Sequence, residues 1–364
     1  MTDARTPHTP VPPRSARAHR APRTLAAAAA LGLLLAGCAT DDPDEGAGAP
    51  ATSAGDDTED DATGEAAGAT AAQDGNTATA GAGAAEGGGD FPVTVDTPTG
   101  ELTLDERPER IVSLSPAATE ILFAIGAGDQ VVAADEFSTY PAQAPTTDLS
   151  GFEPNVEAVA AYEPDLVVVA YDPGDLVASL DALDIPVFVN APPADVESGY
   201  DDIAALGLLT GHVDETADVV AQMRAEMDDA YAAAPEGAQV RVYHEVDDTF
   251  FAASSSSFIG SVYAELGAEN IADEADTDAS GYPQLTEEAV VAADPELIVI
   301  TDEIGYGPEE VAARPGWSEV TAVQQDAVVV VDADIASRWG PRLPQLVQTL
   351  AEALSEAAAV PAGR

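Results

Sequence analysis

The feature that most restricts the fold of this chain is a thirteen-residue segment that occurs twice. Residues 157–169 read EAVAAYEPDLVVV, and residues 288–300 read EAVVAADPELIVI, 131 positions further along. All but two of these positions are identical or conservatively replaced. Each copy predicts a short helix that ends at an acidic residue followed by proline, and then a buried strand. Two copies at this spacing indicate two related α/β lobes, because the interval is too long for a short-period solenoid.

Apolar runs alternate with amphipathic stretches across residues 91–364. Strands are predicted at 110–114, 131–133, 166–169, 186–189, 240–243, 297–300 and 327–331, and helices at 118–125, 200–209, 214–233, 259–266 and 343–357. The strand runs are continuous in valine and isoleucine rather than alternating, which is typical of parallel strands buried on both faces. The predicted fold class is therefore α/β, with largely parallel sheets.

The stretch between the two copies predicts one long, rigid helix. Val219, Val220, Met223 and Met227 recur at helical spacing in an otherwise polar segment. A helix of about 20 residues is about 30 Å long and can join two lobes. We expect two Rossmann-like lobes at 91–212 and 236–364 and a bridging helix at 213–235. The ligand cleft should lie between the lobes, because ligands of open α/β sheets bind beyond the carboxyl ends of the strands.

The first ninety residues predict a targeting segment and a tether rather than a domain. Residues 1–38 are rich in arginine, continue with an apolar run too short to span a membrane, and end at the chain's single cysteine. The motif Leu35-Ala-Gly-Cys38 resembles the lipobox of bacterial lipoproteins, in which the cysteine is lipidated. The alternatives are an ordinary signal peptide with an incidental cysteine, or an uncleaved anchor. Residues 39–90 are acidic and rich in Gly, Ala and Thr, which predicts a disordered tether with a reach of roughly 40 Å.

The charge balance excludes several classes of partner. The chain has 66 Asp and Glu against 13 arginines and no lysine, a formal net charge of −53. Nucleic-acid binding is excluded because phosphate contacts need a basic surface, and direct binding to an anionic membrane surface is disfavoured. The single cysteine excludes a disulfide framework and a cysteine-based metal site. We hypothesise a host adapted to concentrated salt, and expect the chain to be more stable in molar salt than at low ionic strength.

The sequence resembles the class III substrate-binding proteins of ABC importers, which serve the uptake of cobalamin, ferric siderophores and haem. The likeness covers 105–358 in order and lies in residues 110–132, Tyr140-Pro141, both copies of the repeat, 267–271, 315–317 and 337–342. It implies an extracytoplasmic, lipid-anchored, monomeric protein that captures a metal chelate between its lobes. The chelate would pass to a permease dimer with cytoplasmic ATPase subunits. The segment that begins at Tyr243 and residues 337–342 look most like corrinoid binders, which favours cobalamin. A ferric siderophore or haem is the alternative, because Phe152 and Tyr282 stand where some corrinoid binders have tryptophan.

This resemblance, together with the position of each residue after a predicted strand or beside the repeat, indicates the residues that contact the ligand. They are Phe137, Phe152, Tyr171, Phe250, Phe251, Tyr282, Arg338 and Trp339. Aromatic faces suit a large, flat chelate because they bury much area without directional bonds. Phe250 and Phe251 are adjacent, so only one of them is expected to face the ligand. Arg338 either binds an anionic group of the ligand or pairs with Asp332 or Asp334 nearby.

Two glutamates open the two copies of the repeat, Glu157 and Glu288. In the family that the sequence resembles, a glutamate at this position of each lobe docks into arginine pockets of the permease dimer. The resemblance assigns this role to Glu157 and Glu288, since symmetric partners need symmetric contacts. The alternative is that both are ordinary exposed helix carboxylates.

Catalytic motifs are weak in this sequence. His212 and His244 are the only histidines after Cys38, and neither has a second histidine nearby to share a metal ion. His244 with the Ser254–Ser257 run would resemble a hydrolase only loosely, since no Gly-x-Ser-x-Gly elbow is present. We expect a binding protein with no enzymatic activity, no resident cofactor and no protein-borne metal site. A tethered enzyme or a sensor module is the remote alternative.

Overall fold

The computed structural model describes residues 90–359, apart from residues 236 and 238. The predicted targeting segment, the lipobox residue Cys38 and positions 39–89 of the predicted tether lie outside the described residues. Within the described part, no helix has both the length and the apolar character that crossing a membrane requires.

The first lobe is built on a four-stranded parallel sheet in the order β4-β3-β5-β6. Its strands are β3 (Ile111–Leu114), β4 (Val131–Ala134), β5 (Leu166–Val169) and β6 (Val187–Val189). Its helices are α1 (Pro116–Ala124), α2 (Val156–Ala160), α3 (Leu176–Asp181) and α4 (Val196–Thr210). The central strand is β3, in which Ile111 pairs with Val131 on one side and with Leu166 on the other.

The second lobe is built on another four-stranded parallel sheet, in the order β10-β9-β7-β8. Its strands are β7 (Arg241–His244), β8 (Glu269–Asn270), β9 (Leu297–Thr301) and β10 (Val328–Val331). Its helices are α6 (Phe258–Glu265), α7 (Glu287–Ala293), α8 (Pro308–Ala312), α9 (Thr321–Gln324), α10 (Ala333–Ala336) and α11 (Leu343–Ala359).

The two sheets have the same topology. When the strands of each lobe are numbered along the chain, each sheet has the spatial order second, first, third, fourth, read from β4 in the first lobe and from β8 in the second. The repeat supplies the same part of each lobe, namely the third strand and the helix before it: α2 and β5 in one lobe, α7 and β9 in the other. The predicted α/β class with parallel sheets is therefore confirmed, and the duplication extends from thirteen residues to the whole sheet.

The central strands of each sheet are buried on both faces, which explains their continuous apolar runs. In β3, Ile111 packs in a cluster with Ile121 and Leu206, whereas the next residue, Val112, packs in a second cluster on the opposite face. The second lobe repeats this arrangement, because Val242 and Tyr243 of β7 belong to two different clusters.

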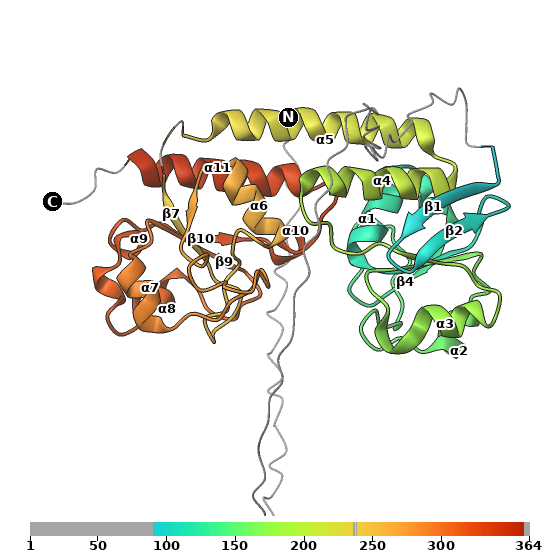
Figure 1. The fold of residues 1–364 in the computed structure, drawn as a ribbon, viewed down its shortest axis with the longest axis horizontal. Helices are drawn as coiled ribbons and strands as arrows, with labels where there is room; N and C mark the ends of the chain where they lie inside the picture. Colours follow the sequence, from blue (N-terminus) through green and yellow to red (C-terminus); the bar gives the residue numbers. More distant parts are fainter. Residues whose placement is uncertain (1–89, 236, 238, 360–364) are drawn as a thin grey trace, which may run out of the picture. The chain divides into compact units, whose positions relative to one another are not determined.

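The long helix α5 (Val213–Ala233) packs against both lobes. Met223 belongs to the first-lobe cluster, and Met227, one turn later, belongs to a second-lobe cluster. Figure 1 shows α5 alongside α4 of the first lobe and α11 of the second, and α5 is in contact with both. One amphipathic helix therefore contributes side chains to two hydrophobic cores.

Several features differ from the sequence-based expectations, including the short helices α3, α8, α9 and α10, which were not predicted. A hairpin of β1 (Val93–Thr97) and β2 (Gly100–Leu104) precedes the first sheet, and β8 has only two residues, too few to leave a hydrophobic pattern. Helix α4 begins at Val196 rather than at residue 200. Its start is fixed by Asp195, whose carboxylate accepts a hydrogen bond from the Ser198 amide at 2.8 Å as part of a capping box.

Candidate ligand-binding site

Three predicted contact residues of the first lobe form one exposed aromatic cluster. The ring centroids of Phe137 and Phe152 are 5.5 Å apart, and those of Phe152 and Tyr171 are 6.5 Å apart. The exposed fractions are 46% for Phe137, 64% for Phe152 and 43% for Tyr171. These residues, the first-lobe aromatic cluster, come from loops that follow the carboxyl ends of β4 and β5. Such exposure is uncommon for large aromatic side chains and marks a surface suited to a ligand.

Small and polar residues hold the loops that carry this cluster. A side chain at Gly151 would place its Cβ 2.6 Å from the Leu114 carbonyl oxygen, so only glycine allows the loop to approach β3 this closely. The Ser150 hydroxyl accepts a hydrogen bond from the Phe152 amide at 3.3 Å. Beside Phe137, the Ser138 hydroxyl donates to the buried Asp135 carboxylate at 2.5 Å. Burial raises the pKa of Asp135, while the hydrogen bonds from Ser138 oppose that shift.

The two adjacent phenylalanines of the second lobe have different environments. Phe250 is half-buried and stacks on Trp317, with ring centroids 6.3 Å apart and an interplanar angle of 28°. Phe251 is 37% exposed, and Tyr282, on a neighbouring segment, is 48% exposed. The two segments are joined by a bridge between Phe251 and Gln284. Phe250 therefore packs against Trp317, and Phe251 is the more exposed of the two.

A buried ion pair supports this packing. The Glu245 carboxylate is fully buried and accepts two hydrogen bonds of 2.7 Å from the Arg314 guanidinium. The Tyr306 hydroxyl donates to the same carboxylate. Arg314 also lies over the ring of Phe250, 5.4 Å from its centroid, and over the ring of Trp317. Phe250 is thus packed between Trp317 and Arg314. These contacts hold its backbone at a φ of +67°, a conformation that bulky residues seldom adopt.

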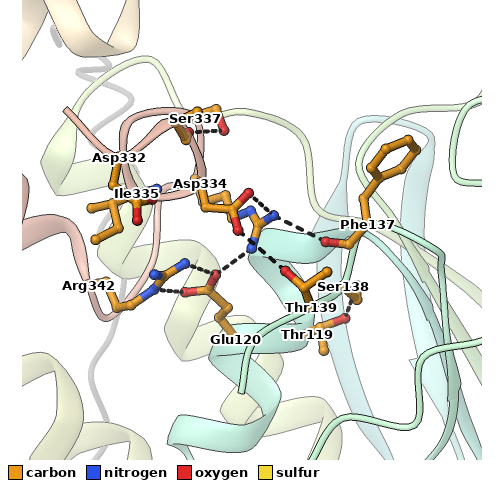
Figure 2. A network of polar contacts seen from close by, with 12 residues as sticks. Thr119, Glu120, Phe137, Ser138, Thr139, Asp332, Asp334, Ile335, Ser337 and Arg342 are labelled. Atoms are coloured by element: carbon orange, nitrogen blue, oxygen red, sulfur yellow. Dashed lines mark hydrogen bonds and ion pairs between the residues drawn. The ribbon is translucent and has the colours of Figure 1, made fainter. Parts of the chain in front are cut away.

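Arg338 takes part in a polar network that joins the two lobes. Figure 2 labels its partners Glu120, Phe137 and Asp334. Its guanidinium donates to the Glu120 carboxylate of α1 at 2.9 Å, to the Phe137 carbonyl oxygen at 3.1 Å, and to the Asp334 carboxylate. Arg342 donates to the same Glu120 carboxylate at 2.8 Å. Figure 2 shows the ring of Phe137 pointing away from this network while its carbonyl oxygen faces it.

Two predicted contact residues thus differ in setting from the exposed aromatics. Of the two roles considered for Arg338, the structure shows the ion pair with Asp334, whereas Asp332 accepts from the Ile335 amide at 2.9 Å and caps α10. Trp339 lines a small pocket together with Tyr200 of α4, Phe258 of α6 and Leu343 of α11. Its ring therefore packs among helices of both lobes.

Both histidines of the described residues lie beside polar side chains of the protein. His244 is buried, its Nδ1 lies 2.8 Å from the Tyr263 hydroxyl, and burial lowers its pKa to about 4. His212 Nε2 lies 3.0 Å from the Gln130 side-chain oxygen. Over the described residues, no group of three or more His, Cys, Asp and Glu side chains is arranged to hold a metal ion.

Glu157 and Glu288 occupy equivalent positions in the two lobes. Each is exposed and is the second residue of its helix, α2 or α7. Each helix begins with a side-chain cap, in which Asn155 accepts from the Ala158 amide at 2.9 Å and Thr286 accepts from the Ala289 amide at 3.2 Å.

An arginine clamps the other end of both helices. Arg110 Nε donates to the Glu163 carbonyl oxygen at 3.0 Å, and Arg241 Nε donates to the Asp294 carbonyl oxygen at 2.9 Å. Arg110 and Arg241 are 131 positions apart, as are Glu163 and Asp294, which is the offset of the repeat. Glu163 and Asp294 also share a φ of +49°. Equivalent arginine–carbonyl hydrogen bonds therefore position the helices that carry Glu157 and Glu288 in the two lobes.

Sequence reasoning did not single out Glu120, Arg342, Glu245 or Arg314. Glu120 left one usable signal: it is the only charged residue of the apolar helix α1, and a buried carboxylate needs a cationic partner. Neither Glu245 nor Arg314 stands in a local pattern that distinguishes it from the many other charged residues.

Two parallel α/β lobes with exposed aromatic side chains after the strands define a two-lobed binding protein. Residues 111–335 match the family model described as periplasmic binding protein, and the chain belongs to this family. Related sequences include the uncharacterized ABC transporter substrate-binding lipoprotein YvrC of Bacillus subtilis, 32% identical, with 72% of this chain and 86% of the relative covered. A cobalamin-binding protein of Halobacterium salinarum is also 32% identical, with 72% of this chain and 74% of the relative covered.

A solved structure shows the same fold. The periplasmic haem-binding protein RhuT of Roseiflexus sp. RS-1, in its apo form, superposes with a TM-score of 0.60 at 26% identity. The match covers 69% of this chain and 99% of RhuT.

Proposed function

We propose that the protein is the extracytoplasmic substrate-binding lipoprotein of an ABC importer, and that it captures a metal chelate between its two lobes. The observation that carries this proposal is the first-lobe aromatic cluster. Three rings from three separate loop positions are held together in the open, where a fold of this family is expected to receive its ligand. Phe251 and Tyr282 provide a matching exposed pair on the second lobe.

A corrinoid is the favoured chelate. One support is the 32% identity to the cobalamin-binding protein of Halobacterium salinarum. The other is that aromatic side chains can bind a large, flat ring system through surface contact, without directional hydrogen bonds. Haem is the second candidate, because the haem-binding protein RhuT has the same fold at 26% identity. A ferric siderophore is the third, on the resemblance described above.

Delivery and anchoring complete the proposal. Glu157 and Glu288, alike in helix position and exposure, would each dock on one subunit of a permease dimer that works with cytoplasmic ATPase subunits. Cys38 would carry the lipid that holds a monomer at the outer face of the membrane.

Calorimetric titration of the full chain with cyanocobalamin, ferric protoporphyrin IX and ferrichrome tests the proposal. We expect one of them to bind at micromolar or tighter affinity without being consumed. Phe152→Ala should weaken that binding about tenfold, since a lost aromatic contact is worth roughly 1.4 kcal/mol. Leu183→Ala is the matched control, because Leu183 is also an exposed apolar side chain of the same lobe and lies outside the aromatic cluster. Absence of binding by all three chelates, or an equal effect of the two variants, would contradict the proposal.

A further inference from the structure

Carboxylates accompany the exposed aromatic side chains. Glu136 precedes Phe137, Glu153 follows Phe152, and Asp248 lies three residues before Phe251. All three carboxylates are exposed. Because no lysine is present in the chain, these negative charges have few cations to oppose them. These three residues, named here the carboxylate rim, place exposed negative charge beside the aromatic side chains of both lobes.

Every arginine that the structure describes already has an internal partner. Arg224, Arg241, Arg314, Arg338 and Arg342 form ion pairs with carboxylates. Arg107 and Arg110 donate to backbone carbonyl oxygens of Thr210 and Glu163. An anionic ligand group normally finds an arginine, whose planar fork matches a carboxylate or phosphate. Over residues 90–359 no arginine stands ready for that role.

Arg338 is the one arginine among the residues that the sequence analysis predicted to contact the ligand, and its guanidinium is already engaged within the protein. Its guanidinium has three acceptors: the carboxylates of Glu120 and Asp334 and the carbonyl oxygen of Phe137. The Arg338 and Glu120 side chains are both buried. Releasing Arg338 to a ligand would give up these bonds and separate buried charges, which is costly.

From these observations we infer that the site selects chelates by charge: it takes neutral or cationic metal chelates and discriminates against those that carry free carboxylate or catecholate charge. This inference rests on the proposed function and names the substrate class of the same site. The carboxylate rim repels an anion, and no described arginine offers compensation. A neutral corrinoid fits this class, whereas haem, with two ionised propionates, does not.

The test uses pairs of chelates that differ in charge. Cyanocobalamin is compared with its tricarboxylic acid, in which three side-chain amides are hydrolysed, and ferric protoporphyrin IX is compared with its dimethyl ester. Ferrichrome, which is neutral, is compared with ferric enterobactin, which is anionic. For the chelate class that binds, we expect the less anionic member to bind the full chain at least about tenfold more tightly at low salt. The ratio should shrink in 1 M salt, where the screening length falls to about 3 Å.

Two triple variants locate the effect. Glu136→Gln with Glu153→Gln and Asp248→Asn removes three charges beside the aromatic side chains and should reduce the ratio between the two members of the pair by about tenfold. Asp218→Asn with Glu226→Gln and Asp229→Asn removes three exposed charges of α5 and should leave the ratio near its original value.

The outcomes separate the two proposals. If no member of any pair binds, the proposed function is wrong. If the anionic member binds as tightly as the neutral one, or if the ratio is insensitive to salt and to the first triple variant, charge selection is wrong while the proposed function stands. A smaller effect of the first triple variant than of the α5 variant would also overturn it.

Discussion

Arg338 and Glu120 are 218 residues apart in sequence, and Arg338 Nη1 lies 2.9 Å from Glu120 Oε1. The arginine follows α10 of the second lobe, and the glutamate lies on α1 of the first. Arg342 and Asp334 complete a group of two cations and two anions, so the charges balance within the network. The lobes are thus joined by this ionic network as well as by the hydrophobic contacts of α5 and the packing around Trp339.

Glu120→Gln should lower the free energy of unfolding by about 3 kcal/mol, because it leaves two partly buried arginines with one fewer charged acceptor. Urea unfolding at neutral pH measures the change. Glu197→Gln is the control, since Glu197 makes a similar paired contact with Arg224 at an exposed position, where ion pairs add little. Equal losses of stability in the two variants would show that the network between the lobes contributes no more to the free energy of unfolding than an exposed ion pair.

Phe250→Ala and Phe251→Ala should have opposite consequences. Phe250 stacks on Trp317 and lies under Arg314, so its loss should lower the free energy of unfolding by about 2 kcal/mol. Phe251 is exposed, so its loss should leave stability within about 0.5 kcal/mol of the wild type and weaken chelate binding about tenfold. Unfolding curves and titrations of both variants decide the assignment. A purely structural effect of Phe251→Ala would return the contact role to Phe250.

The fold was accessible from the sequence because its main determinants are local and repeated. The apolar runs mark strands buried on both faces, and the Met223 and Met227 spacing marks the helix that reaches both cores. The repeated segment predicts a shared topology because a helix, a turn and a strand are each encoded within thirteen residues. The same offset also links Arg110 to Arg241, a relationship that was present in the sequence but is recognisable only once their carbonyl acceptors are known.

The site was less accessible because side-chain partners come from distant positions. The exposed aromatic residues could be named in advance, since few aromatic residues are present and several follow strands, and their role as ligand contacts stays a prediction. Whether Arg338 faces a ligand or an internal carboxylate depends on Glu120, which lies in the other lobe. The sequence around Glu120 does not show which residue it pairs with. Trp339 follows Arg338 directly, yet its surroundings are set by α4, α6 and α11 together.

Asp202 should make stability depend on pH. Burial, with a further contribution from Asp201, raises the pKa of Asp202 to about 6, whereas the unfolded chain has an aspartate pKa of about 3.9. The folded state therefore binds the proton more tightly, and the stability that this provides below about pH 4 is lost as the pH rises to about 6. Asp202→Asn should remove this dependence and raise the free energy of unfolding at pH 7 by about 1 kcal/mol, after allowance for partial exposure.

Urea unfolding of wild type and Asp202→Asn between pH 4 and pH 7 measures the difference, which cancels the titration of the other carboxylates. Asp218→Asn, at an exposed position of α5, is the control and should give a difference that does not change with pH. If Asp202→Asn behaves like this control, the Asp202 side chain is hydrated in the folded protein.

Glu157→Gln and Glu288→Gln should each weaken the association of the chelate-loaded protein with its permease dimer at least about tenfold, and the double variant should weaken it further. The reason is geometric. Both glutamates sit on the first turn of capped helices that an arginine clamps at the far end, so each carboxylate is presented at a fixed place on its lobe. Because the two subunits of a symmetric dimer present the same surface, each glutamate should contribute a similar part of the binding free energy. Binding to permease reconstituted in nanodiscs measures the effect, with Glu226→Gln on α5 as the control. Equal effects of Glu226→Gln and Glu157→Gln would show that net charge, rather than these two positions, governs docking.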